Sequence, residues 1–353
     1  MKADKGKLNK CSGFTIIELL TVMGIIAILI GLLVPALNLV KDYSKELQQK
    51  AQFHSIEAAL GMFSAENRYG RYPESNDNAD PLGGNPYEPD PTPYCGANKL
   101  AEALVGWDLL GYHPNSNFRA DGRFRHPDGN GVMQEAGVKA YHANQDYDGT
   151  PQVGPTNPLY AETAAENVKA RWGPFVELEN ANAFRLDDIY DPADTVGPGL
   201  GDFDTDPCKP KIVLCDVFAK KRHAGKKTGM PILYYKARTQ FTQQDWEARP
   251  GQTLGGIVDD IYYYIDNYNL LALGSAEAPG DWHPLADDYP GGGGTGPPIP
   301  DSQDDWRDFE NMILNPQVTS IKRPYRAGSY ILISAGKDGL YGTPDDIFNF
   351  NKE

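Results

Sequence analysis

A single carboxylate interrupts an apolar stretch near the start of the chain. The sequence from Gly13 to Leu37 reads GFTIIELLTVMGIIAILIGLLVPAL, and Glu18 is its only charged residue. A carboxylate at the centre of a bilayer costs roughly 2.5 to 3.5 kcal/mol on insertion scales. A cost of this size predicts a function for Glu18, and a carboxylate in apolar surroundings can neutralise a positive charge.

A second group of carboxylates lies near the C-terminus, in SAGKDGLYGTPDDIFNFN (residues 334–351). Asp338, Asp345 and Asp346 bracket a glycine-rich turn, so three carboxylates and several free carbonyls could converge on one point. Hard cations such as Ca²⁺ take six to eight oxygen ligands, which a flexible acidic loop can supply. An ordinary turn explains the same residues, because Asp-Gly and Pro-Asp are common turn sequences. The composition leaves both interpretations open.

The apolar stretch that holds Glu18 is long enough to cross a membrane. About 20 apolar residues at 1.5 Å each span the hydrocarbon core of a bilayer, and Phe14 to Val34 meets that length. The preceding residues contain four lysines and one aspartate, a flank that keeps the start of the chain cytoplasmic. The sequence therefore predicts one N-terminal anchor with the C-terminal bulk exported.

Three other interpretations of this N-terminus explain less. A secretory signal peptide would end in a small-residue cleavage site, whereas Val34 to Leu37 lead into another patterned helix. A lipoprotein would carry a cysteine after the apolar run, and Cys11 precedes it. A plain transmembrane anchor accounts for the length and the lysines but leaves the cost of Glu18 unexplained.

The helical pattern continues beyond Pro35 and becomes one-sided, with Phe53, Ile56, Leu60 and Phe63 on one stripe. We expect a single helix from Phe14 to about Tyr69, with Pro73 excluding helix beyond residue 72. The predicted organisation is a leader at residues 1–13, a transmembrane and assembly helix at 14–37, an amphipathic half at 38–72, and an exported globular head at 73–353.

The head is expected to have an α+β fold with an antiparallel β-sheet and long loops. Helices are predicted at 96–111, 163–173 and 304–316, and β-branched and aromatic runs predict strands at 211–218, 230–238, 260–267 and 329–334. Two segments rich in Pro, Gly and Asp, residues 73–94 and 287–305, are predicted as long surface loops.

Composition argues against two classes of function. The chain carries a net charge of −15, and loss of the leader takes it to −18, which disfavours a nucleic-acid-binding surface. The sequence contains no HExxH, no Gly-x-Ser-x-Gly and no P-loop, so no enzyme is expected. Cys95, Cys208 and Cys215 would remain in the exported part; a Cys208–Cys215 bridge and a buried thiol at Cys215 both fit the spacing.

The basic leader, Gly13, the following FTIIELL and the unbroken apolar helix resemble the N-terminus of type IV prepilins and type II secretion pseudopilins. This resemblance implies that a prepilin peptidase cuts between Gly13 and Phe14 and methylates the new amine of Phe14. It also implies that Glu18 engages an N-terminal amine, its own or that of a neighbouring subunit, during assembly into a filament.

The C-terminal sequence resembles the calcium loop of the major type II pseudopilin, which implies Ca²⁺ as a cofactor bound by Asp338, Asp345 and Asp346. The resemblances together imply a pseudopilin-like filament subunit of a type II secretion system with a large insertion in its head. The alternative is a minor or adhesive type IV pilin whose head binds a surface or a glycan.

The resemblance also implies the partners and the location. The expected partners are prepilin peptidase, other pilin or pseudopilin subunits in a homo-oligomeric filament, and an inner-membrane assembly platform. The chain would cross the inner (cytoplasmic) membrane once, with its head in the periplasm or outside the cell.

Overall fold

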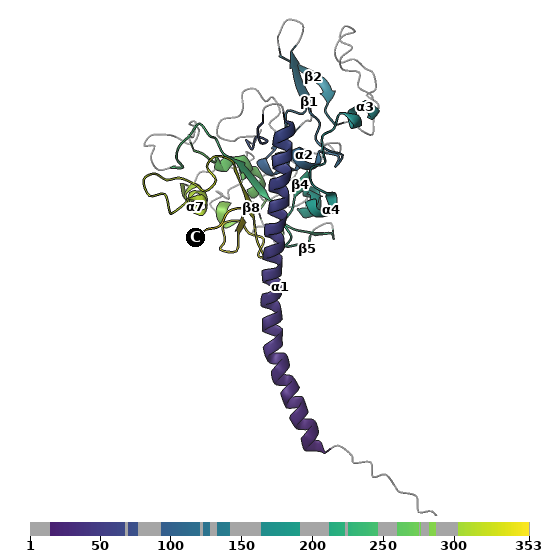
Figure 1. Ribbon diagram of the computed structural model, residues 1–353, viewed down its shortest axis with the longest axis vertical. Helices are drawn as coiled ribbons and strands as arrows, with labels where there is room; N and C mark the ends of the chain where they lie inside the picture. The colour runs from purple at the N-terminus through teal and green to yellow at the C-terminus, as the bar shows by residue number, and fades with distance from the viewer. Residues whose placement is uncertain are drawn as a thin grey trace, which may run out of the picture. The chain divides into compact units, whose positions relative to one another are not determined.

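The computed structural model describes residues 15–67, 70–76, 93–120, 123–127, 133–141, 164–190, 212–222, 225–245, 260–274, 276, 282–286 and 303–352. The chain divides into two compact units, Met1–Leu47 and Gln48–Glu353. Gly13, Phe14, Cys208 and most of the two segments predicted as long loops lie outside the described residues. Figure 1 shows the helices and strands, and the observed architecture confirms the α+β class.

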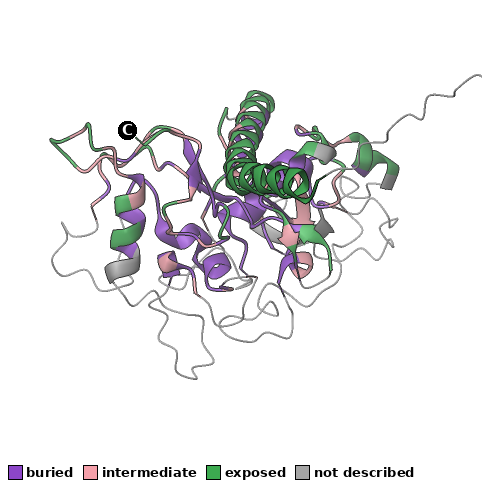
Figure 2. Ribbon diagram, turned by 90° about the horizontal axis from the view of Figure 1, so that it is seen from below, coloured by how far each residue is buried: buried purple, intermediate pink, exposed green. Residues whose placement is uncertain are grey.

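Helix α1 (Ile16–Glu66) is 51 residues long and continues through Pro35, which confirms the predicted single helix over these residues. Its first part is apolar on every side, and its large hydrophobic side chains from Ile16 to Val40 are exposed. Figure 2 colours this part of the helix green. An exposed apolar surface of this extent is unfavourable in water, and the helix is long and apolar enough to cross a membrane.

The last five turns of α1 are one-sided and belong to the head. Their buried residues are Gln49, Gln52, Phe53, Ile56, Ala59, Leu60 and Phe63, which confirms the predicted apolar stripe. The ring of Phe63 meets Tyr112 edge-on at 5.1 Å and Phe175 at 6.0 Å between ring centroids. Aromatic edge-to-face packing of this kind adds stability beyond the buried area alone.

The centre of the head is an antiparallel three-stranded sheet in the order β7 (Leu233–Lys236), β8 (Tyr330–Ser334) and β9 (Ile347–Phe348). All five residues of β8 are buried, so both faces of this strand are covered. Successive side chains of a strand point to opposite faces. Ile331 and Ile333 accordingly join one core cluster, and Tyr330 and Leu332 join the other.

Different helices cover the two faces of this sheet. One face packs against α2 (Gly96–Val105) and the C-terminal part of α1, through Leu100, Leu60 and Phe53. The other packs against α7 (Gln303–Ile313) and the tyrosine-rich segment that begins at Ile261, through Trp306 and Phe309. The purple ribbon in Figure 2 marks these buried layers. Most aromatic side chains of the described residues are thus buried in the core.

The remaining elements of the described residues are short. The paired strands are β1 (Arg123–Pro127) with β2 (Met133–Lys139), β3 (Ala183–Arg185) with β4 (Ile212–Leu214), and β5 (Lys220–Lys221) with β6 (Lys227–Thr228), all antiparallel. The helices are α3 (Ala164–Lys169), α4 (Leu178–Ala181), α5 (Leu186–Ile189) and α6 (Tyr268–Leu271), with 3₁₀ turns η2 (Tyr264–Asn267) and η3 (Pro284–Ala286).

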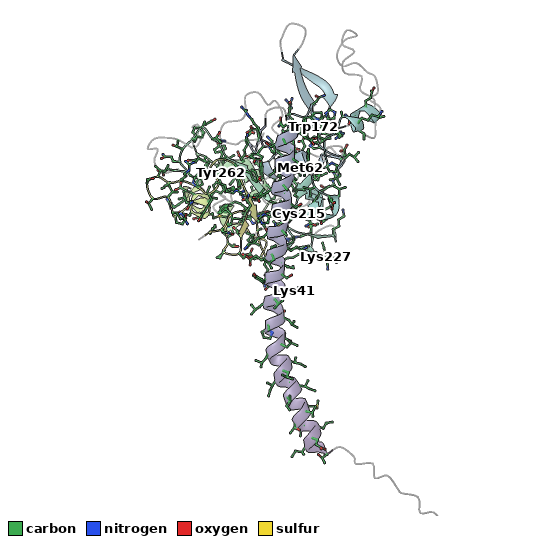
Figure 3. The ribbon with its side chains drawn as sticks, viewed as in Figure 1. Lys41, Met62, Trp172, Cys215, Lys227 and Tyr262 are labelled. Carbon is green, nitrogen blue, oxygen red and sulfur yellow. The ribbon has the colours of Figure 1, made fainter. Side chains whose placement is uncertain are left out.

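Two glutamines of α1 pair with the backbone that follows β4. The Gln52 side chain donates to the carbonyl oxygen of Cys215 at 2.9 Å, and the Gln49 side chain accepts from the N–H of Val217 at 2.9 Å. Figure 3 shows Cys215 beside the helix. These contacts satisfy two backbone groups in the segment that follows β4, and they fix this part of α1 against it.

Three details differ from the sequence expectations or resolve them. The strand predicted at residues 260–267 is wrong: the segment leads into η2 and α6, because the Asn267 side chain binds the backbone of Ala97 and Tyr234 and fixes a turn. Helix α2 ends at Val105 rather than residue 111, because the next residue, Gly106, has a φ of 77°. Cys215 is a buried thiol that forms no disulfide with any described residue.

Candidate functional site

The first turn of α1 shows what Glu18 does within a single chain. Its Oε2 accepts hydrogen bonds from the backbone N–H and the side-chain hydroxyl of Thr15, both at 2.9 Å. The Thr15 hydroxyl in turn accepts from the N–H of Glu18 at 3.3 Å. This reciprocal pair is a capping box, in which a Thr at the N-cap and a Glu three residues later satisfy each other's free N–H groups.

The capping box leaves part of the Glu18 carboxylate available. Among the described residues, Oε1 of Glu18 accepts no hydrogen bond, and the side chain is exposed. A second donor can therefore reach this oxygen without breaking the cap. Gly13 and Phe14, the other two residues of the predicted processing and assembly site, lie outside the described residues.

In the C-terminal loop, Asp345 organises the turn. Its Oδ2 accepts the N–H groups of Lys337 at 2.7 Å and Asp338 at 3.0 Å, and its Oδ1 accepts the hydroxyl of Thr343. These bonds lower the pKa of Asp345 although burial acts in the opposite direction. Gly336 has a φ of 65°, and a Cβ there would lie 2.3 Å from the Asp345 carbonyl oxygen, so the turn requires glycine.

The other two aspartates of the loop are less well satisfied. Oδ1 of Asp338 accepts the N–H of Leu340, and Oδ2 of Asp346 accepts the N–H of Gly342, both at 2.8 Å. The Oδ1 atom of Asp346 is buried with no hydrogen-bond partner among the described residues. Burial raises the pKa of Asp346 to about 8, and the neighbouring carboxylates add to this. Burial and the adjacent Asp345 also raise the pKa of Asp338.

The C-terminal loop offers the oxygen ligands that a hard cation binds, but its carboxylates are only partly arranged around one point. Three carboxylates influence one another's ionisation, and one of them has a buried oxygen without a donor, which is the oxygen chemistry that Ca²⁺ prefers. Within the described part of the chain, however, no three acidic, histidine or cysteine side chains are close enough to share a metal ion. Asp345 in particular is occupied by N–H and hydroxyl donors.

Comparison with known proteins bears on the N-terminus. Residues 8–34 match the prokaryotic N-terminal methylation motif. A prepilin peptidase-dependent protein A of Clostridium perfringens (strain 13 / Type A) is 39% identical to this chain over 66 residues. The N-terminal region is type IV prepilin-like. The alignment covers 19% of this chain and 47% of the relative, so the chain spans about half the length of that curated relative. No solved structure gives a significant match to this chain.

The prepilin-like region coincides with the part of α1 whose large apolar side chains are exposed. The motif at residues 8–34 includes Gly13, Phe14 and Glu18 and most of the exposed apolar half of α1. The N-terminal part of the chain therefore resembles type IV prepilins, and it includes a helix that is long and apolar enough to cross a membrane. The motif does not reach the C-terminal loop.

The structure also contains a buried polar cluster that the sequence analysis missed. Glu102 of α2 is 1% exposed, and its carboxylate accepts hydroxyl groups from Tyr94, Ser116 and Tyr141. Trp107 donates its Nε1–H to the Tyr94 hydroxyl at 2.7 Å, and its ring stacks on Tyr141. The partners come from separate segments, so only the apolar surroundings of Glu102 in ANKLAEALV could have drawn attention to it.

Proposed function

We propose that the mature chain is a filament subunit of the type II secretion pseudopilin kind, inserted in the inner membrane through the first half of α1. The observation that supports this most strongly is Glu18, a capped but incompletely satisfied carboxylate at the start of an exposed apolar helix, within a methylation motif. In a filament the apolar halves of neighbouring subunits would pack together. A neighbouring N-terminal amine would then neutralise Glu18 where the local dielectric is low.

The proposed partners follow from this assembly. A prepilin peptidase would remove residues 1–13, an inner-membrane platform would extract the subunit, and identical subunits would form the filament. The relative from Clostridium perfringens is named for its dependence on prepilin peptidase. The strongly acidic head makes a role in binding nucleic acid unattractive. The alternative assembly is a type IV pilus in which the head serves as an adhesive tip.

Processing is the direct test of this proposal. Coexpression of the full chain with a prepilin peptidase should yield a shorter protein that begins at methylated Phe14, as measured by mass spectrometry of the intact protein. Gly13→Leu should block the cut, because the peptidase must bring the chain backbone close at that position and a bulky side chain would stand in the way. Ser12→Leu is the matched control and should be cut. An intact N-terminus, or a cut after Ala36, would contradict the proposal.

We further propose that the C-terminal loop binds Ca²⁺, which favours the secretion pseudopilin over the adhesive pilin. Asp338, Asp345 and Asp346 would supply carboxylate oxygens after the Asp345 side chain exchanges some of its N–H donors for the cation. The partnerless oxygen of Asp346 and the raised pKa values of Asp338 and Asp346 support this, because a bound cation would offset the repulsion that burial intensifies.

Calcium should accordingly stabilise the head. A ligand at a hundredfold excess over its Kd adds about 2.7 kcal/mol to the free energy of unfolding, a rise of roughly 5 °C in Tm for a domain of this size. Thermal unfolding of the full chain in detergent should show this rise with Ca²⁺, little response to Mg²⁺, and reversal by a chelator.

The variant Asp346→Asn separates a cation site from an ordinary turn. It should abolish the calcium response but leave Tm in chelator unchanged or higher, because the amide keeps an oxygen that accepts the N–H of Gly342 and cannot become a buried negative charge. Asp187→Asn, in an exposed ion pair with Arg185, is the control and should keep the full response. A wild-type chain whose Tm does not respond to Ca²⁺ would make the loop an ordinary acidic turn and favour the adhesive or minor pilin.

A further inference from the structure

An open groove of about 750 Å³ lies between the end of α7 and the segment that follows it. Its lining includes Gln243, Met312, Val318, Arg323, Tyr325 and Lys352. In Figure 1 the label α7 marks the helix at one side of this region. The groove is separate from the C-terminal aspartates, none of which lines it.

Two positive charges in the groove have no carboxylate partner at ion-pair distance in the described part of the chain. Arg323 donates to the carbonyl oxygen of Thr242 at 3.2 Å, and Lys352 lies 3.8 Å from the ring centroid of Phe348. Lys322, by contrast, is held by Asp245 at 2.9 Å and Glu310 at 2.7 Å. Cations beyond ion-pair distance of any described carboxylate are unexpected in a chain with a net charge of −15, and the carboxyl of Asp346 attracts Lys352 only from beyond that distance. They make this groove complementary to an anionic ligand.

The other side chains that line the groove indicate which kind of anionic ligand it could bind. The hydroxyl of Tyr325 is buried without a hydrogen-bond partner among the described residues, so it can serve a ligand. The ring of Tyr325 is stacked on Phe350 at 4.5 Å between ring centroids, so one of its faces is already covered. Met312, Val318 and Ile321 add apolar surface, and Ile321 is 39% exposed. Cations beside apolar side chains suit a polypeptide that carries both carboxylates and apolar groups.

We propose that this groove binds an acidic, extended segment of another polypeptide chain. Arg323 and Lys352 would pair with its carboxylates, the Tyr325 hydroxyl would donate to a carboxylate or backbone carbonyl, and Met312 and Val318 would contact its apolar side chains. This site does not depend on the proposed filament, because the groove lies wholly in the head.

Fluorescence anisotropy with the full chain in non-ionic detergent tests the proposal. The probe is a labelled peptide of Glu-Pro-Glu-Leu repeats, and its match has Gln in place of each Glu. The acidic peptide should bind and weaken with added salt, whereas the Gln peptide should not bind. The double variant Arg323→Glu with Lys352→Glu should raise Kd by about tenfold or more, and Arg323→Gln with Lys352→Gln should have an intermediate effect.

The control changes the net charge by the same amount elsewhere in the head. Lys221 and Lys227 are exposed and lie opposite each other in β5 and β6, and Figure 3 labels Lys227. Lys221→Glu with Lys227→Glu should leave Kd within about twofold of the wild type, because charges outside the groove are screened. Circular dichroism checks that each variant is folded.

Three outcomes would overturn the proposal. The acidic peptide could fail to bind, the control could weaken it as much as the groove variant does, or polygalacturonate could displace it as effectively as unlabelled peptide. The last result would assign the groove to polyanions in general or to acidic glycans. Since the peptide is measured without filament assembly, its failure leaves the processing and Glu18 tests unaffected.

Discussion

Glu18→Gln is expected to abolish incorporation of the chain into filaments while leaving it inserted in the membrane. Glutamine keeps an oxygen that can accept the N–H of Thr15, so the capping box of α1 is largely preserved. The substitution removes the negative charge that a neighbouring N-terminal amine would need. Filaments sheared from cells or pelleted from a reconstituted system should contain less than about one tenth of the wild-type amount, a loss that corresponds to about 1.4 kcal/mol or more.

Two other variants of Glu18 separate its role as a helix cap from the role of its negative charge. Glu18→Ala removes both and should fail to assemble like the glutamine variant, and Glu18→Asp, one methylene shorter, should recover only part of the assembly. Carbonate extraction should leave all three variants in the membrane, since each substitution keeps or lowers the cost of insertion. Normal filaments from Glu18→Gln would show that Glu18 acts as a helix cap alone.

The N-terminal half of this site could be predicted from the sequence because its signals are local. A run of apolar residues sets the length of a membrane helix, and the 3.6-residue stripe of Phe53, Ile56, Leu60 and Phe63 sets the buried face, without reference to any distant segment. The capping box at Thr15 and Glu18 is also visible in the sequence as a Thr-x-x-Glu pattern, but the functional interpretation of Glu18 obscured it.

The head was less predictable because its decisive contacts join segments far apart in the chain. The strands β7 and β8 are recognisable from their β-branched and aromatic residues, whereas 260–267 has the same composition and is not a strand. There the side chains of Asp266 and Asn267 bind Ser75 and Ala97, and no local pattern encodes such contacts. Tertiary hydrogen bonds overrode the β propensity of the tyrosines.

Substitution of Glu102 should also destabilise the head, because its hydrogen-bond partners come from distant parts of the chain. Three hydroxyl groups, from Tyr94, Ser116 and Tyr141, use this carboxylate as their acceptor in the buried cluster. Glu102→Leu would leave these donors buried and unsatisfied, at about 1 to 3 kcal/mol each, and would relieve the burial of one charge. We expect a net loss of about 3 kcal/mol in the free energy of unfolding, measured by urea denaturation of the full chain with tryptophan fluorescence.

Two further variants, Glu66→Leu and Glu102→Gln, test whether the buried hydroxyl groups require Glu102 as an acceptor or whether the head only tolerates its charge. Glu66→Leu, at the exposed end of α1, should change stability by less than about 0.5 kcal/mol.

Burial raises the pKa of Glu102 above its ordinary value of 4.5, so the folded state holds the proton more tightly than the unfolded chain. The stability that protonation of Glu102 adds to the folded state is then fully present below pH 4.5 and declines as the pH rises towards the pKa of the folded state. Glu102→Gln, which cannot titrate, should lose this part of the pH dependence and fall between the wild type and Glu102→Leu at neutral pH. If Glu102→Leu matches or exceeds the wild type in stability, the buried hydroxyls do not depend on the carboxylate, and the cluster contributes packing alone.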